Sequence, residues 1–210
     1  MSILQFFWKN QTQIGELALE HLRLVGVSML LAVLIGIPLG ILLTRRPRFR
    51  RAILGGATIV QTIPSLAMFG FLLPAPWLGE RAGRLAITAL TLYALLPIIQ
   101  NTDAGITGVD AAVREAARGM GMTDWQVLFQ VELPLAFGVI LTGVRVATVI
   151  TVGVATIAAA IGAGGLGEFI FRGLAMVDNR VILAGALPAA LIALVADFSL
   201  SRLERRFRYA

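Results

Sequence analysis

The feature of this sequence that most restricts its fold is a series of five long apolar runs. A helix needs about 20 mostly apolar residues to cross a bilayer. These runs lack the alternating pattern of a membrane β-barrel, and each must satisfy its own backbone polar groups in lipid, so we expect helices. Charged residues fill only 14% of the 210 positions and hydrophobic residues 58%, which excludes an ordinary soluble domain. We therefore predict one all-α integral membrane domain, residues 1–210, with spans at residues 24–43, 52–73, 82–99, 135–160 and 181–200.

The basic residues predict on which side of the membrane each connection lies. Of the 18 basic residues, 17 are arginine, and they gather at the ends of the apolar runs. This placement indicates membrane topology rather than nucleic-acid binding. Five spans put eleven basic residues on one side, which we expect to be cytoplasmic, and six on the other, so the N-terminus is predicted outside and the C-terminus inside. The eleven are Arg45, Arg46, Arg48, Arg50, Arg51, Arg114, Arg118, Arg202, Arg205, Arg206 and Arg208; the six are Lys9, Arg23, Arg81, Arg84, Arg172 and Arg180.

Three segments lie outside the expected spans. Residues 1–23 are expected to form a short helix on the outer surface, because charged residues recur along one face of it. Residues 161–180 combine glycines with a short apolar stretch and predict a re-entrant or interfacial segment on the outer side. Residues 100–134 form the longest cytoplasmic connection. No cleavable signal peptide is expected, since no basic region precedes an apolar run and no small-residue cleavage site follows.

The residue types argue against catalysis, metal binding and nucleotide binding on this chain. Cysteine is absent, and His21 has no set of ligands beside it, so we expect His21 at the surface. The glycines between residues 162 and 167 do not form a nucleotide loop, because Lys9 is the only lysine. They predict a tight turn and close helix packing instead. We expect no catalytic residue, no metal and no cofactor on the chain.

The cytoplasmic loop carries the most informative pattern. Its Ala- and Arg-rich stretch Ala111–Gly119 predicts a short helix, which Gly119 and Gly121 end. Thr123 or Asp124 is expected to cap a second helix, residues 125–131, which Pro134 ends or offsets from the fourth span. This helix–turn–helix has an alanine-rich surface with a polar rim. On these grounds alone it is either a docking surface for a soluble partner or an ordinary structured connection.

The same loop resembles the EAA loop of the permeases of binding-protein-dependent ABC importers. That motif is EAA, three residues, Gly, nine residues, Ile, one residue, Leu-Pro. The sequence departs from it once, at Val131, which keeps a β-branched apolar side chain. The resemblance implies a type I ABC importer permease fold and a coupling helix within residues 111–131 that docks on an ATPase subunit. The matching residues are Glu115, Ala116, Ala117, Gly121, Val131, Leu133 and Pro134.

A second set of motifs is similar to the osmoprotectant branch of these permeases. It comprises the segment QTIPSLA at residues 61–67, Leu-Pro-Ile at 96–98 with Asn-Thr at 101–102, and the glycine run with Glu168. The resemblance implies a permease for glycine betaine, choline or carnitine, with an ABC importer for another small solute, such as an amino acid of the methionine type, as the alternative. It also implies a multi-pass protein of the bacterial inner membrane and several partners: an ATPase subunit that binds ATP and Mg²⁺, a second permease copy or homologue, and an extracytoplasmic solute-binding protein.

Two features inside the spans point to the transport path. Pro64 removes a backbone hydrogen bond and predicts a kink, and Gln61, Thr62 and Ser65 are expected to bond the freed groups. Broken helices often line a translocation path, although a packing kink is the plainer explanation. Arg145 lies at membrane depth, where a charge needs a partner. Direct pairing with Asp197, an anchor to helix-end carbonyls and a role in gating are all compatible with the sequence.

Two other classes of function, a secondary transporter and a structural scaffold, fit the sequence less well. A secondary transporter driven by an ion gradient would be expected to show inverted repeats and a relay of buried carboxylates, and the sequence displays neither. A structural membrane scaffold would leave the spacing of the cytoplasmic loop motif unexplained. We therefore predict a transport subunit rather than an enzyme, with the lipid bilayer and protein subunits as its partners and no nucleic acid.

Overall fold

The structure is a computed structural model that describes residues 3–75, 77 and 81–207. This part of the chain is almost entirely helical and contains no strand, so the all-α class predicted from the sequence is confirmed. Arg208, which contributed to the predicted topology, lies outside the described residues. The helices are α1 (Ile3–Lys9), α2 (Gln11–Arg45), α3 (Arg50–Thr62), α4 (Ser65–Leu72), α6 (Ala82–Thr107), α7 (Ala111–Gly119), α8 (Asp124–Val127), α9 (Leu133–Ile157), α10 (Gly167–Met176) and α11 (Asn179–Phe207), with 3₁₀ turns at Pro47–Phe49 and Ala158–Ile161 and a π-helical turn at Leu128–Glu132.

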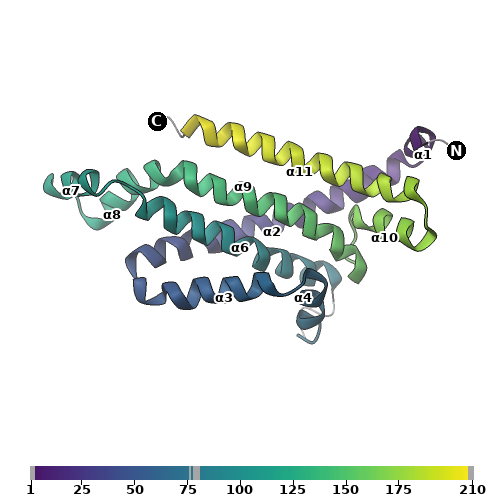
Figure 1. Ribbon diagram of the computed structural model, residues 1–210, viewed down its shortest axis with the longest axis horizontal. Coiled ribbons are helices and arrows are strands. Elements are labelled where there is room, and N and C mark those ends of the chain that lie inside the picture. The colour runs from purple at the N-terminus through teal and green to yellow at the C-terminus, as the bar shows by residue number, and fades with distance from the viewer. Residues whose placement is uncertain (1–2, 76, 78–80, 208–210) are drawn as a thin grey trace.

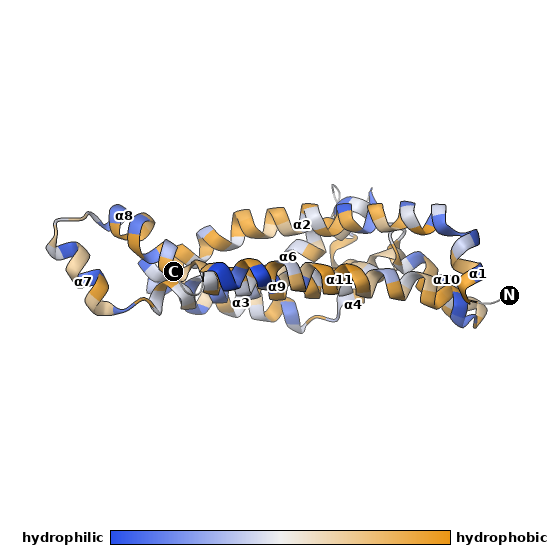
Figure 2. Ribbon diagram, turned by 90° about the horizontal axis from the view of Figure 1, so that it is seen from above, coloured by the Kyte–Doolittle hydropathy of each residue, from blue (hydrophilic) through white to orange (hydrophobic). Residues whose placement is uncertain are grey.

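The long helices form an elongated bundle with two different ends. Helices α2, α6, α9 and α11 run along its length, with α7 and α8 projecting at one end and α1 and α10 at the other (Figure 1). Colouring by hydropathy shows apolar residues along the middle of these helices and polar residues toward the ends (Figure 2). Such a distribution suits a bundle that crosses a bilayer.

Four continuous helical segments of the described chain are long and apolar enough to span a membrane, and a bent pair supplies a fifth. The four are Gln11–Arg45, Ala82–Thr107, Asp124–Ile161 and Asn179–Phe207; the pair is Pro47–Thr62 with Ser65–Leu72. Each predicted span lies largely within one of these segments. The helices are longer than the predicted spans because a helix continues into the polar region as long as no residue stops it.

The expectation of a separate outer helix over residues 1–23 is wrong. Only α1 is separate, and α2 begins at Gln11 and continues unbroken to Arg45. The pattern correctly indicated helix, but it could not show that this helix runs directly into the first span. Burial of Leu17 and His21 shows that the early turns of α2 pack against the rest of the protein rather than lying on a membrane surface.

Helix α6 lies at the centre of the bundle and α11 at its margin. Of the most apolar stretch of each helix, 61% is buried in α6 and 22% in α11. Glycines let the neighbouring helices approach α6 closely. A Cβ at Gly40 of α2 would lie 2.4 Å from Cβ of Thr102, and one at Gly143 of α9 would lie 2.6 Å from Cβ of Asn101. Replacing either glycine would therefore push α2 or α9 away from the core.

Candidate functional site: the loop end and the broken second span

Helix α7 begins and ends at the residues that the sequence predicted. The Asp110 carboxylate accepts a hydrogen bond from the backbone N–H of Ala112 at 2.9 Å and so caps its first turn. The chain then turns through Gly121, whose φ of +84° lies in the left-handed region that favours glycine. The turn thus depends on a glycine that belongs to the loop motif.

Thr123, rather than Asp124, caps the second helix of the loop. The Thr123 hydroxyl accepts a hydrogen bond from the backbone N–H of Gln126, and the Gln126 side chain accepts one from the N–H of Thr123 at 2.8 Å. This reciprocal arrangement is a capping box. Asp124 instead lies 3.5 Å from Arg118 at the end of α7, so that an exposed ion pair links the two loop helices.

The prediction that Pro134 ends the second loop helix is wrong. Helix α8 passes through the π-helical turn Leu128–Glu132 directly into α9, and Pro134 lies in the first turn of α9. Proline is tolerated there because its missing N–H would not find an ordinary helical partner across the wider turn. The offset expected between loop and span therefore takes the form of an inserted π turn within one continuous helix. Helix α8 is consequently joined to α9 by continuous helical backbone.

The motif residues divide into exposed and packed positions. Glu115, Ala116, Gly121 and Pro134 are exposed, Val131 and Leu133 are half-buried, and Ala117 is buried with 2% of its surface accessible. Ala117 thus holds α7 against the rest of the loop, while its two predecessors face outward. The structure gathers the motif at the projecting end of the molecule, where a partner can reach it (Figure 1).

Sequence reasoning missed an apolar surface at this end, which we call the loop patch. It consists of four exposed apolar side chains on α7, α8 and the turns beside them: Val113, Met120, Trp125 and Phe129. The rings of Trp125 and Phe129 stack with their centroids 5.8 Å apart. Apolar side chains gathered at a projecting end, away from the membrane-crossing part of the bundle, mark an interaction surface. Their spacing of four residues on a helix was the signal that could have revealed the aromatic pair.

Beneath the loop, two buried carboxylates form ion pairs with partly exposed arginines. Arg45, at the end of α2, bonds the carboxylate of Glu132 in the π-helical turn, and Arg50, at the start of α3, lies 2.7 Å from the carboxylate of Asp103 in α6. The two acidic side chains are 1% and 3% exposed. From the sequence, Arg45 and Arg50 were expected only to mark membrane topology. They also tie the loop to the ends of the spans.

The second span is broken rather than kinked at Pro64. The axes of α3 and α4 differ by 107° across the break at Ile63 and Pro64. The Gln61 side chain donates to the carbonyl of Tyr93 at 2.9 Å, and the Tyr93 hydroxyl donates to the carbonyl of Ile63. Tyr93 of α6 therefore donates a hydrogen bond to a carbonyl at the break. The sequence had predicted that neighbours of the proline would bond the freed groups.

The other two polar residues beside Pro64 behave differently from the prediction. Thr62 donates to the carbonyl of Ile59 at 2.7 Å within its own helix, and Ser65 opens α4. Thr62 and Pro64 are exposed on the surface of this single chain, while Gln61 and Ser65 are half-buried. The break therefore presents a polar hydroxyl and an interrupted backbone to whatever covers this side of the bundle.

Arg145 on α9 bonds two carboxylates of α11. Its Nε forms an ion pair with Asp197 at 3.3 Å, which was one of the three possibilities that the sequence left open, and its Nη1 donates to Glu204 at 3.0 Å. Glu204 was not predicted, because the expected span stopped at Leu200 while α11 continues to Phe207. One guanidinium shared by two carboxylates holds the C-terminal part of α11 against α9. The groups that anchor Arg145 are thus side-chain carboxylates, whereas helix-end carbonyls had been considered from the sequence.

At the opposite end of the bundle, the prediction of a surface His21 is wrong. His21 is fully buried, and its Nε2 lies 3.2 Å from the carbonyl oxygen of Val152. The glycine turn covers it: a Cβ at Gly165, whose φ is +85°, would lie 3.2 Å from its Nδ1. Gly167 packs so closely against α9 that a Cβ would overlap the carbonyl of Thr156. The tight turn and close packing predicted for these glycines are therefore confirmed, and they explain why His21 is hidden.

The architecture defines a class of membrane permease: a helical bundle with a broken span and a projecting helix–turn–helix. A solved chain from inward-facing conformations of the MetNI methionine ABC transporter superposes with a TM-score of 0.82 at 24% identity, covering 92% of this chain and 95% of that one. A chain from an amino acid ABC transporter with histidines gives 0.79 at 20% identity, covering 98% and 99%. At these identities the likeness shows the fold, and it is the type I importer permease fold that the loop motif implied.

Sequence comparison identifies the family. Residues 36–209 match the model of the binding-protein-dependent transport system inner membrane component. The chain is 43% identical to the osmoprotectant import permease protein OsmW of Salmonella typhimurium, over 97% of this chain and 96% of the relative. It is 42% identical to the carnitine transport permease protein OpuCB of Listeria monocytogenes, over 98% and 93%. The chain belongs to this family of inner-membrane permease components, which are not catalytic subunits.

Proposed function

We propose that this chain is the permease subunit of an ATP-driven importer for quaternary-ammonium compatible solutes such as glycine betaine, choline and carnitine. The observation that carries the solute class is the similarity, over nearly the whole length, to permeases named for carnitine, osmoprotectants and choline. The methionine alternative rests on a likeness at 24% identity, which extends to the fold alone. The named relatives therefore favour the osmoprotectant class.

The loop end is the proposed contact with a separate ATPase subunit. The proposed coupling residues are those of the EAA motif, Glu115, Ala116, Ala117, Gly121, Val131, Leu133 and Pro134, together with the loop patch. The exposed members of this set would contact the ATPase, and the buried Ala117 would hold α7 in place. The exposure of Glu115 and of the stacked Trp125 and Phe129 supports this assignment. ATP and Mg²⁺ would bind to the ATPase, so this chain needs no cofactor of its own. Closure of the ATPase would move α8, and the continuous helix would carry that movement into α9.

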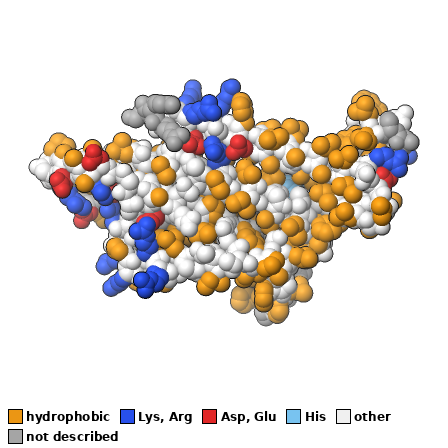
Figure 3. Space-filling model, viewed as in Figure 1, with side chains coloured by type: hydrophobic (Ala, Val, Ile, Leu, Met, Phe, Trp, Pro, Cys, Tyr) orange, Lys and Arg blue, Asp and Glu red, His pale blue; other side chains and the backbone are white. Residues whose placement is uncertain are grey.

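We place the loop end in the cytoplasm and the end formed by α1 and α10 outside, facing a solute-binding protein. The arginines after α2, in α7 and near the C-terminus all belong to the loop end, toward which arginine clusters gather in Figure 3. The positive-inside rule then assigns that end. A reporter active only in the cytoplasm should work when fused after Arg208 and fail when fused at Met1. The reverse result would refute this orientation.

The solute would pass beside the broken second span, at a face completed by a second permease copy or a homologous permease. Gln61, Thr62, Pro64 and Ser65 are the proposed path residues, because the break exposes a polar side chain and backbone in an otherwise apolar wall. For Arg145, which the sequence offered as a candidate for the path or gate, the two carboxylate partners favour the anchoring role. The exposed apolar side chains of α11, including Leu191 and Leu194, would face lipid or the second permease.

The experiment that tests the function is uptake in cells that lack every other route for these solutes. The permease gene is expressed together with genes for an ATPase subunit and a solute-binding protein of the same source, and uptake of labelled glycine betaine, choline, carnitine and methionine is measured. We expect uptake of at least one quaternary-ammonium solute, increasing at high osmolarity. An ATPase variant unable to hydrolyse ATP serves as the control. Uptake of methionine alone would overturn the proposed solute class.

A further inference from the structure

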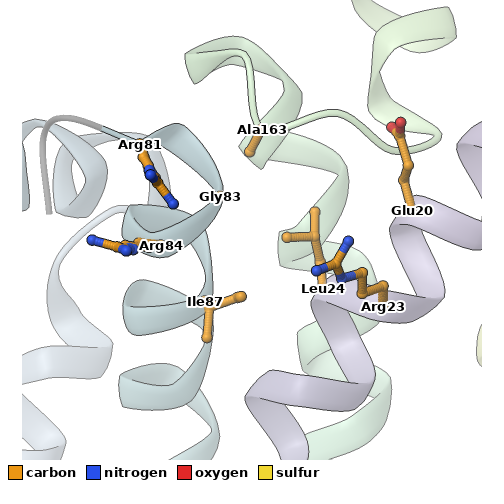
Figure 4. A pocket seen from close by; sticks show the side chains of 8 residues that line it. All are labelled: Glu20, Arg23, Leu24, Arg81, Gly83, Arg84, Ile87 and Ala163. Carbon is orange, nitrogen blue, oxygen red and sulfur yellow. The ribbon is translucent and has the colours of Figure 1, made fainter.

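A cavity of about 480 Å³ opens at the proposed outer end, between the start of α6 and residues 20–24 of α2. Arg81 immediately precedes α6 and Arg84 lies in the first turn of that helix, while Arg23 reaches from α2 toward the start of α6, with Glu20 beyond (Figure 4). The cavity is also lined by Leu24, Gly83, Ile87 and Ala163. The volume lies within the range of small-molecule sites, which is about 300–1,000 Å³.

The three arginines of this cavity lie on the predicted outer side of the membrane, where basic residues are less frequent. Basic residues on the outer side oppose the charge asymmetry that orients a membrane protein, yet three of the six predicted outer ones line this cavity. None of the three forms an ion pair with a carboxylate in the part of the chain that the structure describes. Three guanidinium groups that line one concave space, without a carboxylate ion-pair partner among the described residues, suit an anion.

Glu20 gives the cavity a second, opposite pole. Its Oε2 accepts a hydrogen bond from the backbone N–H of Gly165 at 3.1 Å, which fixes the carboxylate at the edge of the glycine turn. A Cβ at Gly164 would lie only 2.4 Å from the same oxygen, so the turn leaves room for that carboxylate only because residue 164 is glycine. The cavity therefore offers Arg81 and Arg84 at the start of α6, Arg23 on α2, and one held carboxylate on α2 beside the glycine turn.

We propose that this cavity receives the carboxylate of a zwitterionic solute on its way into the permease. This inference deepens the proposed function and rests on it. Glycine betaine and carnitine carry a carboxylate and a quaternary ammonium group, which match the arginines and Glu20 respectively. Choline has the ammonium group but a hydroxyl in place of the carboxylate. The cavity thus favours zwitterions over a purely cationic solute by Coulomb interaction with its net positive charge.

Uptake by variants of the assembled transporter provides the first test. The double variant Arg81→Gln, Arg84→Gln should reduce the kcat/KM for glycine betaine about 10-fold or more, the loss expected for a charge-assisted hydrogen bond, and change that for choline less than about twofold. The variant Arg81→Lys, Arg84→Lys should recover part of the loss. Lys9→Gln is the matched control, because it removes an exposed outer charge that does not line the cavity. Equal losses for both solutes, or none, would overturn the proposal.

A direct measurement separates this proposal from the proposed function. The purified transporter in liposomes is treated with phenylglyoxal, which modifies arginine, and labelling of Arg23, Arg81 and Arg84 is followed by mass spectrometry. Glycine betaine should slow their labelling several-fold, while equal choline should not. Protection by the solute-binding protein alone would assign the cavity to protein docking and refute the solute site, as would no protection. If no quaternary-ammonium solute is taken up by the wild type, the proposed function fails, yet labelling still decides the site.

Discussion

Replacing Arg45 with methionine tests whether the end of α2 holds the loop in place through Glu132. The Glu132 carboxylate is 1% exposed, Arg45 is its ion-pair partner, and its Oε1 has no hydrogen-bond partner in the structure. Methionine retains the apolar stem and removes the charge. The variant would therefore leave a carboxylate buried without its counter-charge, at the π-helical turn that joins α8 to α9.

The expected cost follows from the burial of the pair. Removing one partner of a buried ion pair costs about 3–5 kcal/mol. Because Arg45 is 32% exposed, water screens part of the interaction, and we expect the lower end, about 3 kcal/mol. Glu132→Gln should cost only about 1–2 kcal/mol, since the amide oxygen still accepts a hydrogen bond from Arg45. The double variant Arg45→Met, Glu132→Met buries no charge and should be less destabilised than Arg45→Met alone.

Thermal unfolding of the purified permease, with ATP hydrolysed per solute imported as a second readout, measures these differences. At about 2–4 °C per kcal/mol, Arg45→Met should lower Tm by roughly 6–12 °C. Arg46→Met is the matched control, because the neighbouring arginine is exposed and forms no ion pair in the described part of the chain. If Arg45→Met cost no more than Glu132→Gln, or if the double variant were destabilised at least as much as Arg45→Met alone, the pair would not hold the loop.

Three further substitutions test the loop and the broken span. Gly121→Val should strain the turn by about 1–3 kcal/mol, because φ is +84°, and should lose ATPase co-purification at normal membrane levels, whereas Gly119→Ala at the open end of α7 should retain it. Glu115→Lys leaves folding intact because the side chain is exposed, so transport should fall with no change in Tm; full transport would make the loop a mere connector. Tyr93→Phe leaves the Ile63 carbonyl without its donor and should cost about 1–3 kcal/mol in unfolding experiments; an unchanged Tm would show that the carbonyl finds another partner.

Local features of this protein were readable from the sequence because their causes are local. Chain composition determines that five runs are apolar enough to enter a membrane. Alanine and glycine set the bounds of α7 at Ala111–Gly119, and Pro64 breaks its helix because it lacks an N–H. The spacing of the EAA motif indicated the permease family, and the need of a charge at membrane depth for a partner led to Arg145 and Asp197. In each case the neighbouring residues along the chain carry the information.

Burial and partnership, by contrast, were decided by the tertiary structure. His21 had the sequence context of a surface residue, but a glycine turn more than a hundred residues later covers it. Glu132 had no predicted partner, and the fold brings Arg45 beside it. Tyr93 donates a hydrogen bond to the carbonyl at the break between two other helices. Helix packing sets which distant groups share a buried space, and a buried polar group must find its partner there. That pairing depends on the arrangement of whole helices, which no local stretch of sequence specifies.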